Sequence, residues 1–214
     1  MLKTEEHPEV AAVDPLFSMD DESSEQTESD EPIKTDKELE AEAVKKEWLL
    51  YREIVTSDPF YQETSSSIKK MLSFKVWKAI KERTPDPDIG DVCLGQVVQR
   101  VEIIPGKLVP HFRLISAKEW RYIIDKMTGL IPAQMPNQQA IYRLVFGMYS
   151  LGNVPVWSSD VINPDGSVND DKVERLMRKL EERPVDVLHL LGVHYDWFRA
   201  RMHMLLEDGQ VKNG

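Results

Sequence analysis

Six oxygen-bearing side chains recur at calcium-loop spacing near residue 165. They fall at positions 1, 3, 5, 7, 9 and 12 of an EF-hand frame and are Asn163, Asp165, Ser167, Asn169, Asp171 and Glu174. Position 1 of that frame prefers aspartate, however, and Val168 stands where the frame needs glycine. A Pro-Asp-Gly turn that leads into the acidic start of a helix explains the same residues. The sequence therefore favours a plain turn over 163–174, with a calcium site as the alternative.

Histidine and cysteine offer less for catalysis or metal binding. His189, His194 and His203 lie on one predicted helix, but zinc ligands on one helical face need separations of three or four residues. Cys93 stands in an apolar run, where a thiolate is disfavoured, so we expect it in the core. The chain also lacks GxSxG, GxGxxG and P-loop sequences. We therefore predict no catalytic residue, no cofactor and no metal.

Aromatic and methionine content points instead to protein binding. The chain has five tryptophans and nine methionines, and both types are enriched in the cores of interfaces. Trp157 lies in a loop-rich stretch, while Trp197 and Met202 lie on the last predicted helix. Phe17 belongs to an apolar cluster among acids, a pattern typical of short docking motifs. We predict these four residues as protein contacts, with core burial as the alternative for the tryptophans.

Charge divides the chain into two parts. Residues 1–32 hold eleven of the 37 acids and one of the 27 bases, so the remaining residues carry 26 of each. This first segment is poor in apolar residues, which predicts a disordered acidic tail. The neutral body does not favour a nucleic-acid partner, because such binders carry a basic face. The basic face of residues 69–83 is the local exception, although lysines on a helix commonly form its solvated side.

Capping residues and apolar spacing predict the first half of the body. Thr35-Asp36-Lys37-Glu38 has capping-box spacing and predicts a helix over 35–55. Serines 65–67 offer caps to a second helix over 67–82. Residues 92–115 then change to an alternating pattern around Pro105-Gly106, which predicts a β-hairpin. Its alternation puts Val97, Gln99, Val101 and Ile103 on the buried face.

Helical spacing returns in the second half. The predicted helices span 117–128, 137–151, 171–181 and 184–207. The second of these is apolar on nearly all sides, which places it in the centre of a core. We therefore predict a mainly α fold with one β-hairpin (α+β), in which residues 33–209 form a single mostly helical domain behind the acidic tail.

Three further features of the sequence concern the cellular compartment of the protein. Cys93 is the only cysteine, so no intramolecular disulfide can form, which favours a reducing compartment. The first residues carry glutamates where a signal peptide needs basic and then apolar residues. No stretch reaches the 18 apolar residues of a membrane span. We expect a cytoplasmic protein with no membrane partner.

The order of elements in the second half resembles that of a known family. The segments are VEIIPGKLVPHFRLI, SAKEWRYIIDKM, QQAIYRLVFGMYSLGNVPVW and VERLMRKLEERPVDVLHLLGVHYDWFRARM. A hairpin ahead of a helical body with a proline-initiated last helix resembles tailed-bacteriophage proteins of the tail assembly chaperone and baseplate assembly type. The resemblance covers about residues 92–206 and includes no signature motif, so no functional residue transfers. It implies a non-catalytic protein that acts on a tape-measure or baseplate component in the host cytoplasm.

These observations predict a non-catalytic assembly factor or structural subunit of a larger complex, with a role in phage tail or baseplate assembly as its finer form. Its partners are proteins, and self-association into a homo-oligomer is compatible with the same apolar surface. The alternative is a regulatory nucleic-acid-binding protein that uses the basic face of residues 69–83.

Overall fold

The computed structural model describes residues 35–58, 61, 64–152 and 161–212, with the backbone alone at 208–212. The predicted tail over 1–32 lies outside these residues. From Asp36 onward the chain forms one compact unit. It is mainly helical and includes one small antiparallel sheet, so the predicted fold class is confirmed.

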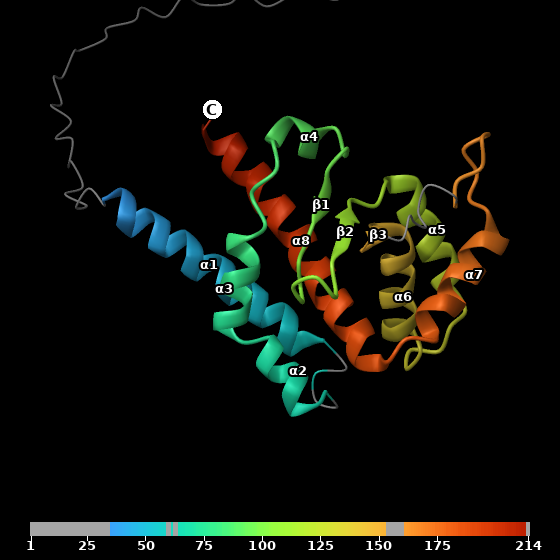
Figure 1. Ribbon diagram of the computed structural model, residues 1–214. Helices are drawn as coiled ribbons and strands as arrows, with labels where there is room; N and C mark the ends of the chain where they lie inside the picture. The colour runs from blue at the N-terminus through green and yellow to red at the C-terminus, as the bar shows by residue number, and fades with distance from the viewer. Residues whose placement is uncertain (1–34, 59–60, 62–63, 153–160, 213–214) are drawn as a thin grey trace, which may run out of the picture. The chain divides into compact units, whose positions relative to one another are not determined.

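Helix α8 (Val185–Lys212) lies at the centre of this unit, between α1 and α3 on one side and the sheet and α6 on the other (Figure 1). Neighbours surround it, because the successive residues Trp197 and Phe198 are both almost completely buried although they point in different directions. The prediction put the helix over 137–151 in this central place instead. That helix begins with exposed residues at 135–137 and is buried only near its end.

Helices α1 (Asp36–Ser57), α2 (Ser66–Met71) and α3 (Phe74–Glu82) come first along the chain. Two helices replace the single helix predicted over 67–82, because the chain turns at Leu72 and Ser73. Ser73 is extended and serves as the N-cap of α3, while Leu72 is buried. The turn lets α2 and α3 bury separate apolar faces, which one straight helix cannot do.

A short helix that was not predicted precedes the hairpin. Helix α4 (Ile89–Cys93) begins where the Asp88 side chain accepts a hydrogen bond from the Gly90 N–H. It carries Cys93 on the surface, which corrects the expected core position. The predicted hairpin over 92–115 therefore starts later, with β1 (Val98–Arg100) pairing antiparallel with β2 (Pro110–Arg113).

Buried and exposed residues alternate around β1 as predicted. Val97, Gln99, Val101 and Ile103 are buried, and Val98 and Arg100 are exposed. Ile104 and Leu108 pair across the tight turn that contains Gly106, whose φ of 65° suits glycine. The sheet therefore has one buried and one solvated face in this region.

A third strand corrects the prediction of a helix over 137–151. Helix α6 (Met135–Gly147) ends at Gly147, and β3 (Met148–Leu151) then pairs with β2 to give the order β1-β2-β3. A Cβ atom on Gly147 would lie 2.2 Å from the Tyr195 ring of α8. Only glycine therefore allows α6 and α8 to approach this closely.

Helices α5 (Ala117–Met127) and α7 (Asp170–Glu181) complete the unit beside α6. The predicted capping box starts α5: Ser116 accepts from the Glu119 N–H, and Glu119 accepts from the Ser116 N–H. Glu119 also accepts hydrogen bonds from Arg113 at 2.5 and 3.1 Å, which ties the helix to β2. None of the described helices has the length and apolar content needed to cross a membrane.

Candidate functional site

Two of the four predicted contact residues are core residues in the structure. Trp197 is fully buried and its indole N–H donates to Glu47 at 3.1 Å, while Met202 is 1% exposed. The burial of Trp197 against Tyr51 and Trp77 agrees with the core alternative. Met202 also borders the open groove between α1 and α8, so its assignment as a protein contact stays a prediction. Phe17 and Trp157 lie outside the described residues.

Residues 163–174 form a hydrogen-bonded turn that leads into α7. Asp165 accepts from the Ser167 N–H at 2.8 Å, and the amide side chain of Asn169 donates to Asn163 at 2.9 Å. The Asn169 oxygen also caps α7 through the Lys172 N–H. These oxygens serve the turn itself, as ordinary turn chemistry predicts. No group of three or more His, Cys, Asp or Glu side chains gathers as a metal site within the described ranges.

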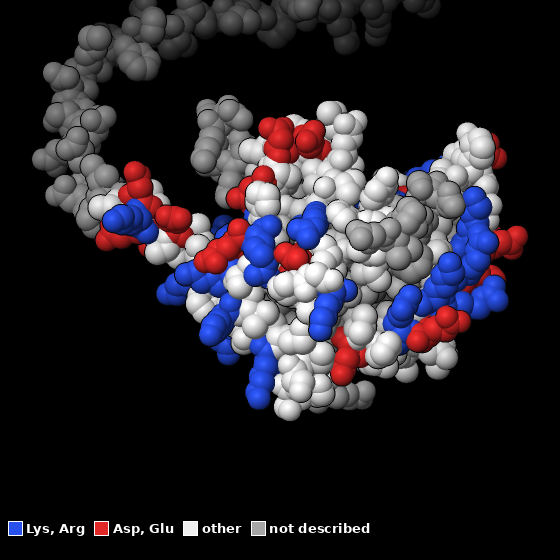
Figure 2. All heavy atoms as spheres, viewed as in Figure 1, with Lys and Arg blue, Asp and Glu red and all other residues white. Residues whose placement is uncertain are grey.

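The basic face of residues 69–83 contributes fewer free cations than the sequence indicated. Lys81 pairs with the buried Glu47, and Arg83 lies 3.6 Å from Glu102. Lys78 lies 4.0 Å from Glu82. Basic side chains gather over α1 and α3 and along α7, with acidic side chains among them (Figure 2). This mixed charge is typical of a solvated surface.

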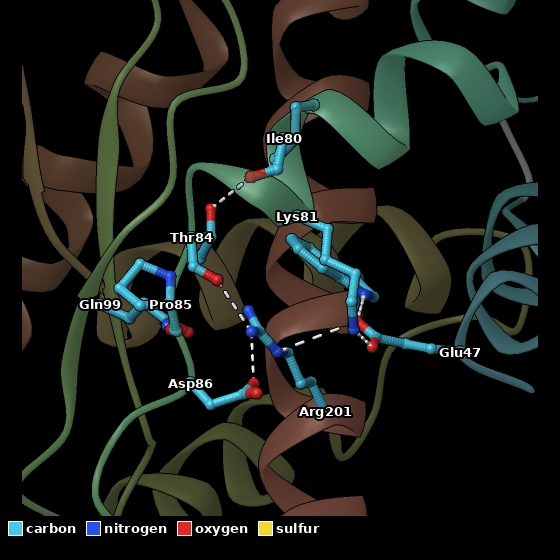
Figure 3. A network of polar contacts seen from close by, with 9 residues as sticks. Glu47, Ile80, Lys81, Thr84, Pro85, Asp86, Gln99 and Arg201 are labelled. Carbon is cyan, nitrogen blue, oxygen red and sulfur yellow. Dashed lines mark hydrogen bonds and ion pairs between the residues drawn. The ribbon is translucent and has the colours of Figure 1, made fainter. Parts of the chain in front are cut away.

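A buried ion network joins α1, α3 and α8. Glu47 of α1 accepts from Lys81 of α3 and from Trp197, and its carboxylate lies 3.9 Å from the Arg201 side chain. In Figure 3, Arg201 reaches from α8 to Asp86 and to the Thr84 carbonyl, to which it donates at 2.8 Å. Burial lowers the pKa of Lys81, and the nearby Arg201 lowers it further.

The same network borders an open cavity of about 580 Å³. Its charged lining residues are Lys37, Lys78, Lys81 and Arg201 together with Glu40, Glu82 and Asp86. Positive and negative charges nearly balance in this lining, and Lys81 and Arg201 already pair with carboxylates. Such mutual pairing is typical of a structural ion network. We therefore assign it to the packing of α1 against α8.

A second cavity has a different character. It is an open groove of about 590 Å³ between α1, α8 and the connection from β2 to α5. Its aliphatic lining residues are half-buried and are Leu50, Ile54, Leu114, Ile115, Ala200 and Leu206. We call these residues, with Trp120 at one end, the apolar groove. Its volume is in the range of ligand-binding clefts, and its walls are formed by packed helices.

One end of the apolar groove is charged. Asp196 of α8 accepts from Arg143 of α6 at 3.3 Å and lies 3.5 Å from Arg199. Both guanidinium groups also lie over the Trp120 ring, at 5.7 and 5.8 Å from its centre. Burial raises the pKa of Asp196, whereas the two arginines act in the opposite direction. We call these four residues the Trp120 cluster.

The sequence contained only part of this site. In the first predicted helix, Leu50 and Ile54 follow the apolar spacing and widen its apolar stripe. Trp120 follows the capping box of α5. No local pattern shows that α1, α5 and α8 place these side chains around one groove, because their contacts are set by tertiary packing.

Comparison of the chain with protein-family models, curated proteins and solved structures finds no match.

Proposed function

We propose that this protein is a non-catalytic assembly factor or structural subunit that binds a partner protein through the apolar groove. The observation that carries the proposal is the row of half-buried aliphatic side chains from three separate elements around an open groove. Apolar surface of this kind gains free energy when a partner covers it. The occupant that suits it is an amphipathic helix of the partner, which places apolar side chains into a groove between helices.

The chemistry of the lining favours a protein over a small metabolite. A metabolite site usually adds several convergent polar groups to its apolar walls. Here Asp196 and Arg199 belong to the Trp120 cluster, and apart from His203 the rest of the lining is apolar. Tryptophan and arginine next to aliphatic surface are typical of interface hot spots.

The finer form of the proposal, a role in phage tail or baseplate assembly, rests on the resemblance over residues 92–206 alone. The regulatory nucleic-acid-binding alternative has less support, because Lys78, Lys81 and Arg83 are paired with carboxylates. This alternative predicts that the protein binds DNA and that the binding weakens steeply as the salt concentration rises.

The decisive experiment compares two adjacent leucines of α1. Leu50→Lys places a charge in the apolar groove, whereas Leu49→Lys alters an exposed residue that does not line it. Each variant is tagged and recovered from the cells that naturally produce the protein, and bound proteins are quantified by mass spectrometry. We expect Leu50→Lys to reduce partner recovery at least about tenfold, roughly the effect of 1.4 kcal/mol, and Leu49→Lys to leave it unchanged.

Circular dichroism and urea unfolding of both variants provide the necessary control for folding. Equal recovery with Leu50→Lys and Leu49→Lys, when both are folded, would show that the groove does not bind the partner. Turnover of any substrate by the purified chain would contradict the non-catalytic part of the proposal.

A further inference from the structure

The Trp120 cluster has an excess of positive charge at the end of the apolar groove. Two guanidinium groups, those of Arg143 and Arg199, share the single carboxylate of Asp196. The other charged lining residue, His203, lies 3.8 Å from Glu207 and so has its own carboxylate nearby. The four residues of the Trp120 cluster carry one more positive than negative charge, and the next carboxylates are Asp58, which acts on Asp196, and Glu207, which lies beside His203.

Arg199 is placed to use that excess. Its side chain is 40% exposed and lines the groove, whereas the Arg143 side chain is 25% exposed and lies behind it on α6. The ring of Trp120 supports both guanidinium groups, which limits their freedom before any ligand arrives. A guanidinium carries five N–H donors, so its contact with Asp196 leaves others for a second carboxylate.

We infer that the apolar groove selects an acidic amphipathic segment of its partner, with the apolar side chains on Leu50, Ile54 and Leu206 and a carboxylate on Arg199. This inference rests on the proposed function and specifies the chemistry of the partner. The aliphatic walls supply most of the contact area. The Trp120 cluster sets the direction of the segment, because Arg199 is the arginine that lines the groove.

The net charge of the chain makes this inference sharply testable. The whole protein carries −10, so non-specific attraction favours a basic ligand. A preference for an acidic ligand must therefore come from a local site. Two synthetic 14-residue peptides serve as probes, both with leucines at helical spacing, one with glutamates and the other with lysines at the remaining positions. Each carries a fluorescent label, and binding to the full chain is followed by anisotropy.

We expect the glutamate peptide to bind about tenfold more tightly than the lysine peptide at low salt, with the preference falling as salt rises. Arg199→Gln should reduce the preference several-fold. Asp196→Asn should increase it, because both arginines then lack their carboxylate. The matched control is Arg178→Gln on α7, an exposed arginine that does not line the groove, which should leave the preference unchanged.

The opposite signs of Arg199→Gln and Asp196→Asn separate a charge effect from general damage, which would weaken binding in both. Equal affinity for the two peptides, or tighter binding of the lysine peptide, would overturn the inference while the groove could still bind a partner. Partner recovery that is lost in Leu50→Lys separates this failure from that of the proposed function. Binding of neither peptide, with partner recovery still sensitive to Leu50→Lys, would also overturn the acidic-segment inference.

Discussion

Helix α8 contacts α1 and α3 on one side and the sheet and α6 on the other, and its buried side chains differ between these sides. Toward α1 and α3 it presents His194, Trp197 and Arg201, which hydrogen bond to Tyr51, Glu47 and the Thr84 carbonyl. Toward the sheet and α6 it presents Tyr195 and Phe198, which pack on Phe112 and, for Tyr195, against Gly147.

The comparison separates two ways of fixing one helix. On the α1 side, charged and polar groups are buried, and each depends on a partner to offset its loss of water. On the sheet side, the fit depends on the volumes of aromatic rings and on one glycine. Damage on the first side should therefore be repaired by restoring charge balance, and damage on the second by restoring space.

The largest effect is expected from Glu47→Gln. The change keeps the shape of the side chain but leaves Lys81 and Arg201 with a deficit of negative charge inside the protein. We expect the free energy of unfolding to fall by about 3 kcal/mol, as is usual when one member of a buried ion pair is removed. Urea unfolding at pH 7 measures it, and Glu53→Gln on the exposed face of α1 is the matched control.

A double variant, Glu47→Gln with Lys81→Gln, sharpens this test. Removing both charges should cost less than the sum of the two single changes, because the uncompensated lysine is gone. Simple addition of the two losses would show that the buried charges are independent, and the α1 side would then not differ in kind from the sheet side.

Acid should weaken the same side through His194. Burial lowers the pKa of His194 to about 4, from 6.5 for an exposed histidine. Between these values the unfolded chain binds a proton that the folded chain does not, so stability falls as the pH drops from 6.5 to 4. The full loss is about 3 kcal/mol, and it is absent above pH 6.5. A series of urea unfolding curves between pH 7 and pH 4 measures it.

Comparison with His194→Gln isolates this contribution from the other titrating groups. The variant should be less stable at pH 7, because the contacts of the ring with Tyr51 and the Leu190 carbonyl are lost. Its stability should, however, depend less on pH between 6.5 and 4. The same slope in the variant and the original protein would assign the acid sensitivity to other groups.

Features set by local sequence patterns were predicted better than features set by tertiary packing, on both sides of α8. The capping box at Ser116 and the alternation from Val97 to Ile103 are local patterns, and both elements form where those patterns lie. The break at Ser73 and the end of α6 at Gly147 depend on what packs against them, and no local pattern contains that information. Trp197 shows the same limit, because a residue beside an apolar stripe is exposed only if no second element covers it.

The candidate site follows this division. The aliphatic residues Leu50 and Ile54 and the position of Trp120 on a helix could be read from spacing. Their meeting around the groove required the mutual placement of α1, α5 and α8. The sharing of Asp196 by arginines from two helices is likewise a tertiary property, since Arg143 is 53 residues away along the chain.

The smallest of the three stability effects concerns space on the sheet side. Gly147→Ala places a methyl group within 2.2 Å of the Tyr195 ring, so the ring or the helix must move. We expect the free energy of unfolding to fall by about 2 kcal/mol, measured by urea unfolding, as is typical of overpacking.

Adding Tyr195→Leu, which removes the ring, should make the Gly147→Ala change much less costly, because the available space and not the charge limits this position. Gly192→Ala is the control, since no atom lies within 4 Å of its added carbon, and it should stabilise α8 by about 0.5–1 kcal/mol. An equal cost of Gly147→Ala with and without the Tyr195 ring would show that backbone conformation, and not packing against α8, requires glycine at the end of α6.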